Sequence, residues 1–311
     1  MNTKPTSIFH VKGIFLEKAD VDKKVDKWTP DSPDGIGGFG MSILKILARY
    51  TLLNKACILK CAQSINPSQW KVSKISTTLR ALRKAKMIHM YQMEGSATDE
   101  ASLIVYCLSE KAEALLQEKN IAYSENITIK ELLNYTGLTT EEEKEVATYT
   151  CTRLLALNQW HINMLYNMGD RTICNFYKSF KIEDITIPSV ITYRPMRANT
   201  KKAGKISLFT FFAPNNDEKM ELLANELVKT YNFLSSPQHK KYRPSIIIVL
   251  CENTNHSAWV SWKFSQFRQL RQIDSALYAI DIGTSKERML ALLNECRANE
   301  LGIMRTGINL E

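Results

Sequence analysis

Between Met41 and Met93 the chain carries ten Lys and Arg residues and no Asp or Glu. The whole chain has 41 Lys and Arg against 32 Asp and Glu, so outside this stretch the two signs nearly cancel. A dense block of one sign repels itself and raises a local positive field, which proteins tolerate mainly where a polyanion binds. Two interpretations are open at this point: a solvated basic face without a ligand, or a surface for nucleic acid. We call residues 41–93 the basic block.

The basic block has the apolar spacing of three helices. From Ser42, apolar residues recur every three or four positions and predict an amphipathic helix, and residues 55–64 support a second, shorter one. A break at residues 66–68 can start a third helix. The third helix has an apolar stripe that we expect to be buried, made of Val72, Ile75, Leu79 and Leu82.

The side of the third helix opposite its stripe is polar. At about 100° per residue, this side presents Ser73, Thr77, Arg80 and Lys84, with Lys74 at its edge. Hydroxyl groups can donate to or accept from base edges, and the planar guanidinium of Arg matches guanine O6 and N7. We predict that Arg80 and Thr77 read bases, with Ser73 as a helper. The predicted phosphate contacts are Lys71, Lys74, Arg83 and Lys84.

Two short strands follow the third helix. Residues 88–93 and 103–108 enclose the turn-rich segment 94–100 and predict a hairpin. Three helices followed by a hairpin predict a winged helix-turn-helix that binds double-stranded DNA. The tip of the hairpin has three acidic residues that phosphates would repel: Glu94, Asp99 and Glu100. We therefore assign no phosphate contact to the hairpin.

Helical segments connect the hairpin to the second half of the chain. Ser109 can cap a helix that runs to residue 117, residues 128–135 predict a short helix, and Thr140 with Glu143 forms the capping box of a long one. One stripe of the long helix holds Val146, Thr150, Leu154, Leu157, His161, Met164 and Met168. This stripe is either core or the seam of a homodimer, which would place two recognition helices on successive turns of DNA. We expect His161 to be a hydrogen-bonded packing residue.

From residue 172 onward, short apolar runs alternate with helical patterns. The predicted strands are 172–180, 185–193, 205–213, 244–251 and 277–282, and the predicted helices are 218–233, 258–270 and 285–300. This order is typical of a small α/β domain with a mixed sheet.

The chain as a whole is predicted to be an α+β protein with two domains. Its segments are a flexible lead-in (1–39), the winged helix-turn-helix (40–118), a helical connector (119–170) and the α/β domain (171–311).

Apolar runs and cysteines give the expected location of the protein. The longest aliphatic run, Ile246 to Cys251, is far shorter than the roughly 20 residues of a membrane helix, and residues 1–12 lack the apolar stretch of a secretory signal. We therefore predict a cytoplasmic protein that does not contact membranes. The seven cysteines are odd in number and scattered, so we expect buried, reduced thiols.

Several features resemble one family. They are the pattern of Tyr106, Leu108 and Ser109, His161 near the end of a long helix, a strand led by Pro188, and a strand, loop and helix from Leu208 to Tyr231. Over about residues 41–280 the chain resembles the replication-relaxation family of plasmids and integrative mobile elements. The resemblance implies a DNA-binding winged helix joined to a domain similar to PD-(D/E)xK nucleases. It also implies a role in plasmid replication or conjugative transfer, with replication or transfer proteins as partners.

The acids that such a nuclease needs are missing at the matching positions. A metal-dependent nuclease holds Mg²⁺ with carboxylates on adjacent strands. Ser189 stands where the family has the first acid, and residues 208–213 contain none. We therefore predict a degenerate, non-catalytic domain without metal or cofactor. The alternatives are a transcriptional regulator and a divergent Mg²⁺-dependent nuclease that uses Asp184, Asp217 or Glu218.

Overall fold

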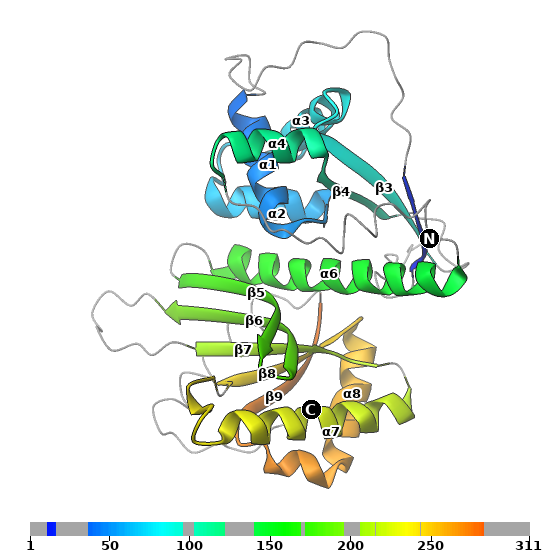
Figure 1. Ribbon diagram of the computed structural model, residues 1–311, viewed down its shortest axis with the longest axis vertical. Coiled ribbons are helices and arrows are strands. Elements are labelled where there is room, and N and C mark those ends of the chain that lie inside the picture. The colour runs from blue at the N-terminus through cyan, green and yellow to red at the C-terminus, as the bar shows by residue number, and fades with distance from the viewer. Residues whose placement is uncertain are drawn as a thin grey trace. The chain divides into compact units, whose positions relative to one another are not determined.

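The computed structural model describes residues 11–16, 37–95, 103–121, 140–168, 172–195, 206–214, 216–242 and 244–282 (Figure 1). Internal contacts divide the chain into two compact units, Met1–Ile162 and Asn163–Glu311. Helices and a mixed sheet make it an α+β protein, as predicted. In the described part of the chain, no helix has both the length and the apolar character of a membrane span.

The basic block folds as three helices, as its apolar spacing predicts. They are α1 (Gly37–Tyr50), α2 (Lys55–Ile65) and α3 (Val72–Lys84). The prediction of a flexible lead-in up to residue 39 is wrong for its last residues, because α1 already begins at Gly37. The edge of the Phe39 ring packs against Trp70, with 4.9 Å between the ring centroids. This contact outweighs the poor helix propensity of the neighbouring glycines.

A four-stranded sheet also belongs to the first unit. The predicted hairpin is confirmed as antiparallel β3 (Ile88–Gly95) and β4 (Leu103–Leu108). Two strands that the apolar pattern did not predict lie on either side of the hairpin. They are β1 (Val11–Leu16), which pairs with β3 and falls in the predicted lead-in, and β2 (Leu53–Asn54), which pairs with β4. Asp99 and Glu100 of the predicted tip lie outside the described residues.

The predicted apolar stripe of α3 is buried except at its first position. Ile75, Leu79 and Leu82 are at most 3% exposed, but Val72 is 57% exposed. The expectation that Val72 is buried is therefore wrong. At about 100° per residue Val72 stands at the border of the stripe, on the side of Ser76 and Arg83.

Two predicted helix starts have the expected caps. Ser109 precedes α4 (Glu110–Glu118), and its Oγ accepts from the Ala112 amide at 3.3 Å. Thr140 and Glu143 form a reciprocal capping box before α6 (Glu141–Met168), with two amide-to-side-chain distances of 3.1 Å. The short helix predicted at 128–135 lies outside the described residues.

The second unit contains a five-stranded mixed sheet, as predicted. Its order is β5-β6-β7-β8-β9, with antiparallel pairing from β5 to β7 and parallel pairing from β7 to β9. The strands are β5 (Thr172–Ile182), β6 (Ile185–Pro195), β7 (Ile206–Phe212), β8 (Ile246–Cys251) and β9 (Ala276–Asp281). All six residues of β8 are buried, as expected for a central strand covered on both faces.

Two helices follow strands of this sheet. The first, α7 (Asp217–Ser235), matches its predicted range closely. The second, α8 (Thr254–Gln266), begins four residues earlier than predicted, because the Asn253 side chain accepts from the His256 amide and caps it there. Residues 268–270, predicted as the end of this helix, belong instead to a 3-10 helix, Arg268–Gln272. The helix predicted at 285–300 lies outside the described residues.

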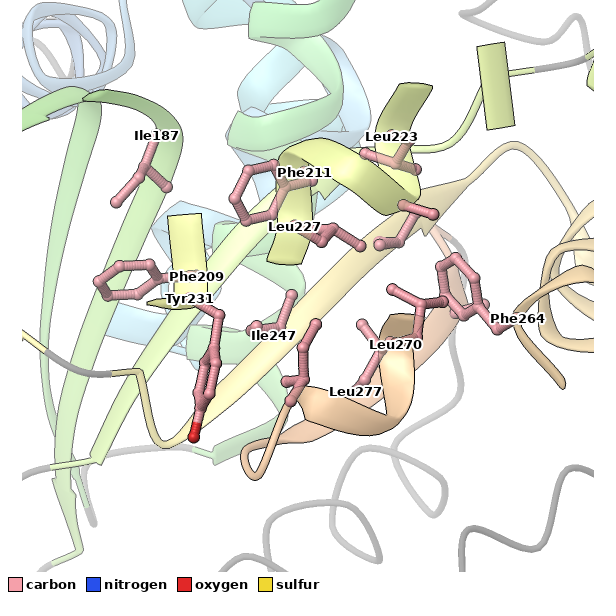
Figure 2. Packing of buried hydrophobic residues seen from close by; sticks show 14 of the residues in the cluster. Ile187, Phe209, Phe211, Leu223, Leu227, Tyr231, Ile247, Phe264, Leu270 and Leu277 are labelled. Atoms are coloured by element: carbon pink, nitrogen blue, oxygen red, sulfur yellow. The ribbon is translucent and has the colours of Figure 1, made fainter. Parts of the chain in front are cut away.

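One face of the sheet and helix α7 share a core (Figure 2). Phe209 and Phe211 of β7 pack with Leu223 and Leu227 of α7 and with Ile247 of β8. All five side chains are at most 6% exposed. The apolar face of α7 therefore holds this helix against the sheet.

Two leucines of α7 provide a matched test of this core. Leu227 is 0% exposed, whereas Leu222 is 63% exposed. We expect Leu227→Ala to lower the free energy of unfolding by about 2–5 kcal/mol, because it removes buried methyl groups and leaves a cavity. Leu222→Ala should change it by less than about 0.5 kcal/mol. Urea unfolding followed by circular dichroism measures both values, and equal losses would contradict the assigned core.

Candidate nucleic-acid interface

The turn before α3 is held by side chains that fix where this helix begins. The Gln63 side chain donates to the Trp70 carbonyl at 3.0 Å, and the Ser68 hydroxyl donates to the Asn66 side chain at 3.0 Å. Trp70 is 5% exposed and lies against Phe39. Because Trp70 is anchored on α1 and α2 residues, the first turn of α3 has a defined position.

The seven predicted DNA-binding residues lie on or just before α3, on its solvent side. Five of them are exposed: Lys71, Ser73, Thr77, Arg80 and Lys84. Lys74 and Arg83 are half-buried. The structure therefore places six of the seven on α3 and Lys71 at its N-cap, with the buried stripe on the opposite side.

The two half-buried cations have contacts inside the first unit. The ammonium of Lys74 lies 4.0 Å from the centroid of the Phe39 ring, a cation–π contact. The Nη1 atom of Arg83 lies 3.6 Å from the sulfur of Met90 on β3. Both side chains are thereby positioned by neighbouring elements, and their charges stand at the edges of the exposed face rather than at its centre.

Like the buried Thr78, two residues on the outer side of α3 direct their hydroxyl groups to the helix backbone. Ser76 Oγ donates to the Val72 carbonyl at 2.9 Å, and Thr77 Oγ1 donates to the Ser73 carbonyl at 3.0 Å. In this rotamer the Thr77 oxygen can still accept a hydrogen bond, but the hydroxyl proton is already donated to the Ser73 carbonyl. Arg80, with its planar guanidinium, is therefore an exposed donor near the middle of the face, beside Ser73 and Lys84.

Helix α6 supports the end of α1 through buried polar groups. Asn158 Nδ2 donates to the carbonyls of Tyr50 and Leu52, at 2.7 and 2.8 Å. His161 Nδ1 lies 2.9 Å from the Tyr50 hydroxyl, and both residues are 0% exposed. The prediction that His161 is a hydrogen-bonded packing residue is confirmed. Sequence reasoning missed Asn158, because a polar residue within a helix gives no local sign of a distant partner.

The Asn158 contact can be tested by truncation. We expect Asn158→Ala to lower the free energy of unfolding by about 2–3 kcal/mol, because it removes two buried hydrogen bonds, to the carbonyls of Tyr50 and Leu52. Gln159→Ala, at the next and only half-buried position of α6, should have a much smaller effect. Chemical denaturation measures the difference, and a loss below about 1 kcal/mol for Asn158→Ala would contradict this role.

Five cysteines are free thiols and buried, as predicted: Cys57, Cys61, Cys107, Cys151 and Cys251. Burial raises the pKa of Cys61 to about 11 and the pKa values of Cys57 and Cys151 to about 12. Because a raised pKa keeps a thiol neutral, these side chains are poor nucleophiles and poor metal ligands at neutral pH.

Thiol labelling tests this burial. In a Cys174→Ser, Cys296→Ser background, we expect labelling of the native protein at pH 8 to be at least about a hundredfold slower than labelling of the denatured protein, since so little thiolate is present. A disulfide reagent that releases a coloured product follows both reactions. Comparable rates in the two states would contradict the burial.

In the second unit, the candidate metal-binding acids lie apart from the positions that the family resemblance indicates. Asp184 is exposed in the turn between β5 and β6, and Asp217 and Glu218 are exposed in the first turn of α7. An Asp217 oxygen is 2.9 Å from Lys263 Nζ, in an ion pair. Among the described residues, no three His, Cys, Asp or Glu side chains are grouped as metal ligands would be.

Ser189, which stands where the family has its first acid, lies in a row of paired residues across the sheet. Ser189 pairs in register with Thr210 on one side and with Lys178 on the other. Ser189 and Thr210 are 0% exposed and their hydroxyls have no hydrogen-bond partner, while burial lowers the pKa of Lys178 to about 8. This row has one amine and two hydroxyls but no carboxylate, so it lacks the charged oxygen ligands that Mg²⁺ takes in proteins.

Comparison of the chain with protein-family models, curated proteins and solved structures finds no match. The resemblance to the replication-relaxation family therefore stays a prediction from the sequence.

Proposed function

We propose that the first unit contains a winged helix-turn-helix that binds double-stranded DNA through α3. The order of elements supports the proposal, because α1, β2, α2, α3 and the β3–β4 hairpin follow one another as they do in that fold. In such modules the second helix of the helix-turn-helix enters the major groove and contacts base edges.

The observation that carries the proposal is the exposed cationic side of α3. Lys71, Arg80 and Lys84 are exposed there, and no acid stands anywhere in the basic block to neutralise them. Neutralising phosphates releases condensed counterions, and this is the main sequence-independent source of affinity for DNA. A solvated face without a ligand would gain nothing from the exclusion of acids.

The residues of this face have different proposed roles. Arg80 reads a base, because its exposed guanidinium can form a bidentate contact with guanine. Thr77 and Ser73 assist as acceptors or by close packing. Lys71 and Lys84 hold phosphates, and Lys74 and Arg83 reach phosphates at the edges of the face. The hairpin has no assigned contact.

The wider role rests on the family resemblance. We propose a non-catalytic accessory protein of a plasmid or conjugative element, whose second unit is a platform for replication or transfer proteins. Burial of Leu154, Leu157 and Met164 supports the core interpretation of the α6 stripe. A homodimer through the connector would therefore use the exposed start of α6, at Val146 and Tyr149.

Two substitutions separate base reading from phosphate binding. We expect Arg80→Ala to cost about 1–3 kcal/mol and to relax sequence preference, whereas Lys84→Ala should weaken binding to all sequences alike. Lys219→Ala, at an exposed lysine of α7, is the matched control and should have no effect. Fluorescence anisotropy with preferred and scrambled duplexes measures these changes.

The same titrations at several salt concentrations test the phosphate contacts. For about five neutralised phosphates, log affinity should fall against log salt with a slope of about −4 to −5, and Lys84→Ala should reduce it by about one. Equal losses on every duplex for both variants would remove the base-reading role of Arg80. Absence of any salt-dependent binding would overturn the proposed function.

A further inference from the structure

Val72 is an apolar side chain on the face of α3 that carries the cations. It is the first residue of the helix and is 57% exposed. Single exposed apolar residues are common on proteins and by themselves indicate nothing. Val72 differs in its position, because it stands on the helix that the proposed function places in the major groove.

The polar side chains around Val72 leave it accessible. Ser76, one turn along, donates its hydroxyl to the Val72 carbonyl, so its proton is directed to the backbone rather than outward. Arg83, on the same side of the helix, reaches toward Met90. At about 100° per residue, Val72 is about 80° around the helix from Arg80. Both side chains can therefore face one groove surface.

The major groove offers one kind of apolar group at this position. Each base pair presents hydrogen-bonding atoms there, and thymine adds its C5-methyl group. Resting on the proposed function, we propose that Val72 binds the C5-methyl group of a pyrimidine and so contributes to sequence selection. Thymine and 5-methylcytosine both carry this group, which is the shared ligand chemistry.

The helix geometry limits where that pyrimidine stands. Val72 and Arg80 are eight residues apart, or about 12 Å along the helix at about 1.5 Å per residue. At about 3.4 Å per base pair this distance spans three to four base steps. The methyl-bearing pyrimidine is therefore expected within about four base pairs of the guanine that Arg80 contacts.

The test begins with duplexes that the full-length protein selects from a random pool. Each thymine of the selected site is then replaced singly by deoxyuridine, which removes only the methyl group. For the wild-type chain, one such replacement should weaken binding about fourfold, the value for one buried methyl group. In Val72→Ala this penalty should disappear.

Leu222→Ala is the matched control, because Leu222 is similarly exposed at 63% but lies on α7. It should keep the full deoxyuridine penalty. A second arm replaces the critical thymine by cytosine or 5-methylcytosine. Recovery of affinity with 5-methylcytosine alone would assign recognition to the methyl group rather than to other features of thymine. Circular dichroism confirms that both variants fold.

The possible failures are distinguishable. The role of Val72 is overturned if no deoxyuridine within about four base pairs of the guanine weakens binding. It is also overturned if Val72→Ala shows the same penalty as the wild-type chain. Both results leave DNA binding intact. Binding without enrichment of any sequence overturns base reading by both Val72 and Arg80. No binding to any duplex overturns the proposed function, and the role of Val72 with it.

Discussion

The orientation of α3 depends on the contact between its apolar side and the neighbouring helices α1 and α2. Burial of Ile75, Leu79 and Leu82 contributes roughly 1.5–3 kcal/mol for each side chain. The cations on the other side repel one another, but salt screens exposed charges beyond about 8–10 Å. The apolar contact is therefore the larger effect and decides which side of α3 faces solvent. The positions of Arg80 and Lys84 follow from that contact rather than from any interaction of their own.

A second set of contacts fixes the start of α3 and the end of α1. Near the start of α3, Trp70 is held by Phe39 and by the Gln63 side chain. Just past the end of α1, Asn158 donates to the carbonyls of Tyr50 and Leu52, and His161 lies within hydrogen-bond distance of the Tyr50 hydroxyl. These bonds are buried, where the loss of one partner costs more than it does at the surface. The proposed role of α3 in reading bases needs such support, because a small displacement of the start of the helix would move every exposed side chain away from its contact.

The sequence predicted those parts of the fold that are encoded locally. Apolar periodicity located α2, α3, the hairpin and all five strands of the second sheet, and the capping box of Thr140 and Glu143 located the start of α6. It did not predict the helical turn before Ser42, which depends on the distant Trp70, nor β1, which exists through pairing with β3. In the candidate site, the helical wheel predicted the exposed residues but placed Val72 with the buried ones. Whether a residue at the border of the stripe is buried depends on how far the neighbouring helices extend over it. The positions of those helices are set by other segments of the chain.

In the proposed complex with DNA, the residues on the exposed face of α3 would contribute unequally to affinity and to sequence selection. Cations that contact phosphates raise affinity for every duplex, so Lys71 and Lys84 would not distinguish one sequence from another. The Thr77 hydroxyl is directed to the helix backbone, which reduces its part in discrimination. The proposed base contacts are then the polar one of Arg80 and the apolar one of Val72, about two helical turns apart. Since each mismatched base pair costs about 1–3 kcal/mol, one such helix discriminates only modestly among sequences. Strong selection would require a second recognition helix, which gives a dimer through the exposed start of α6 a physical purpose.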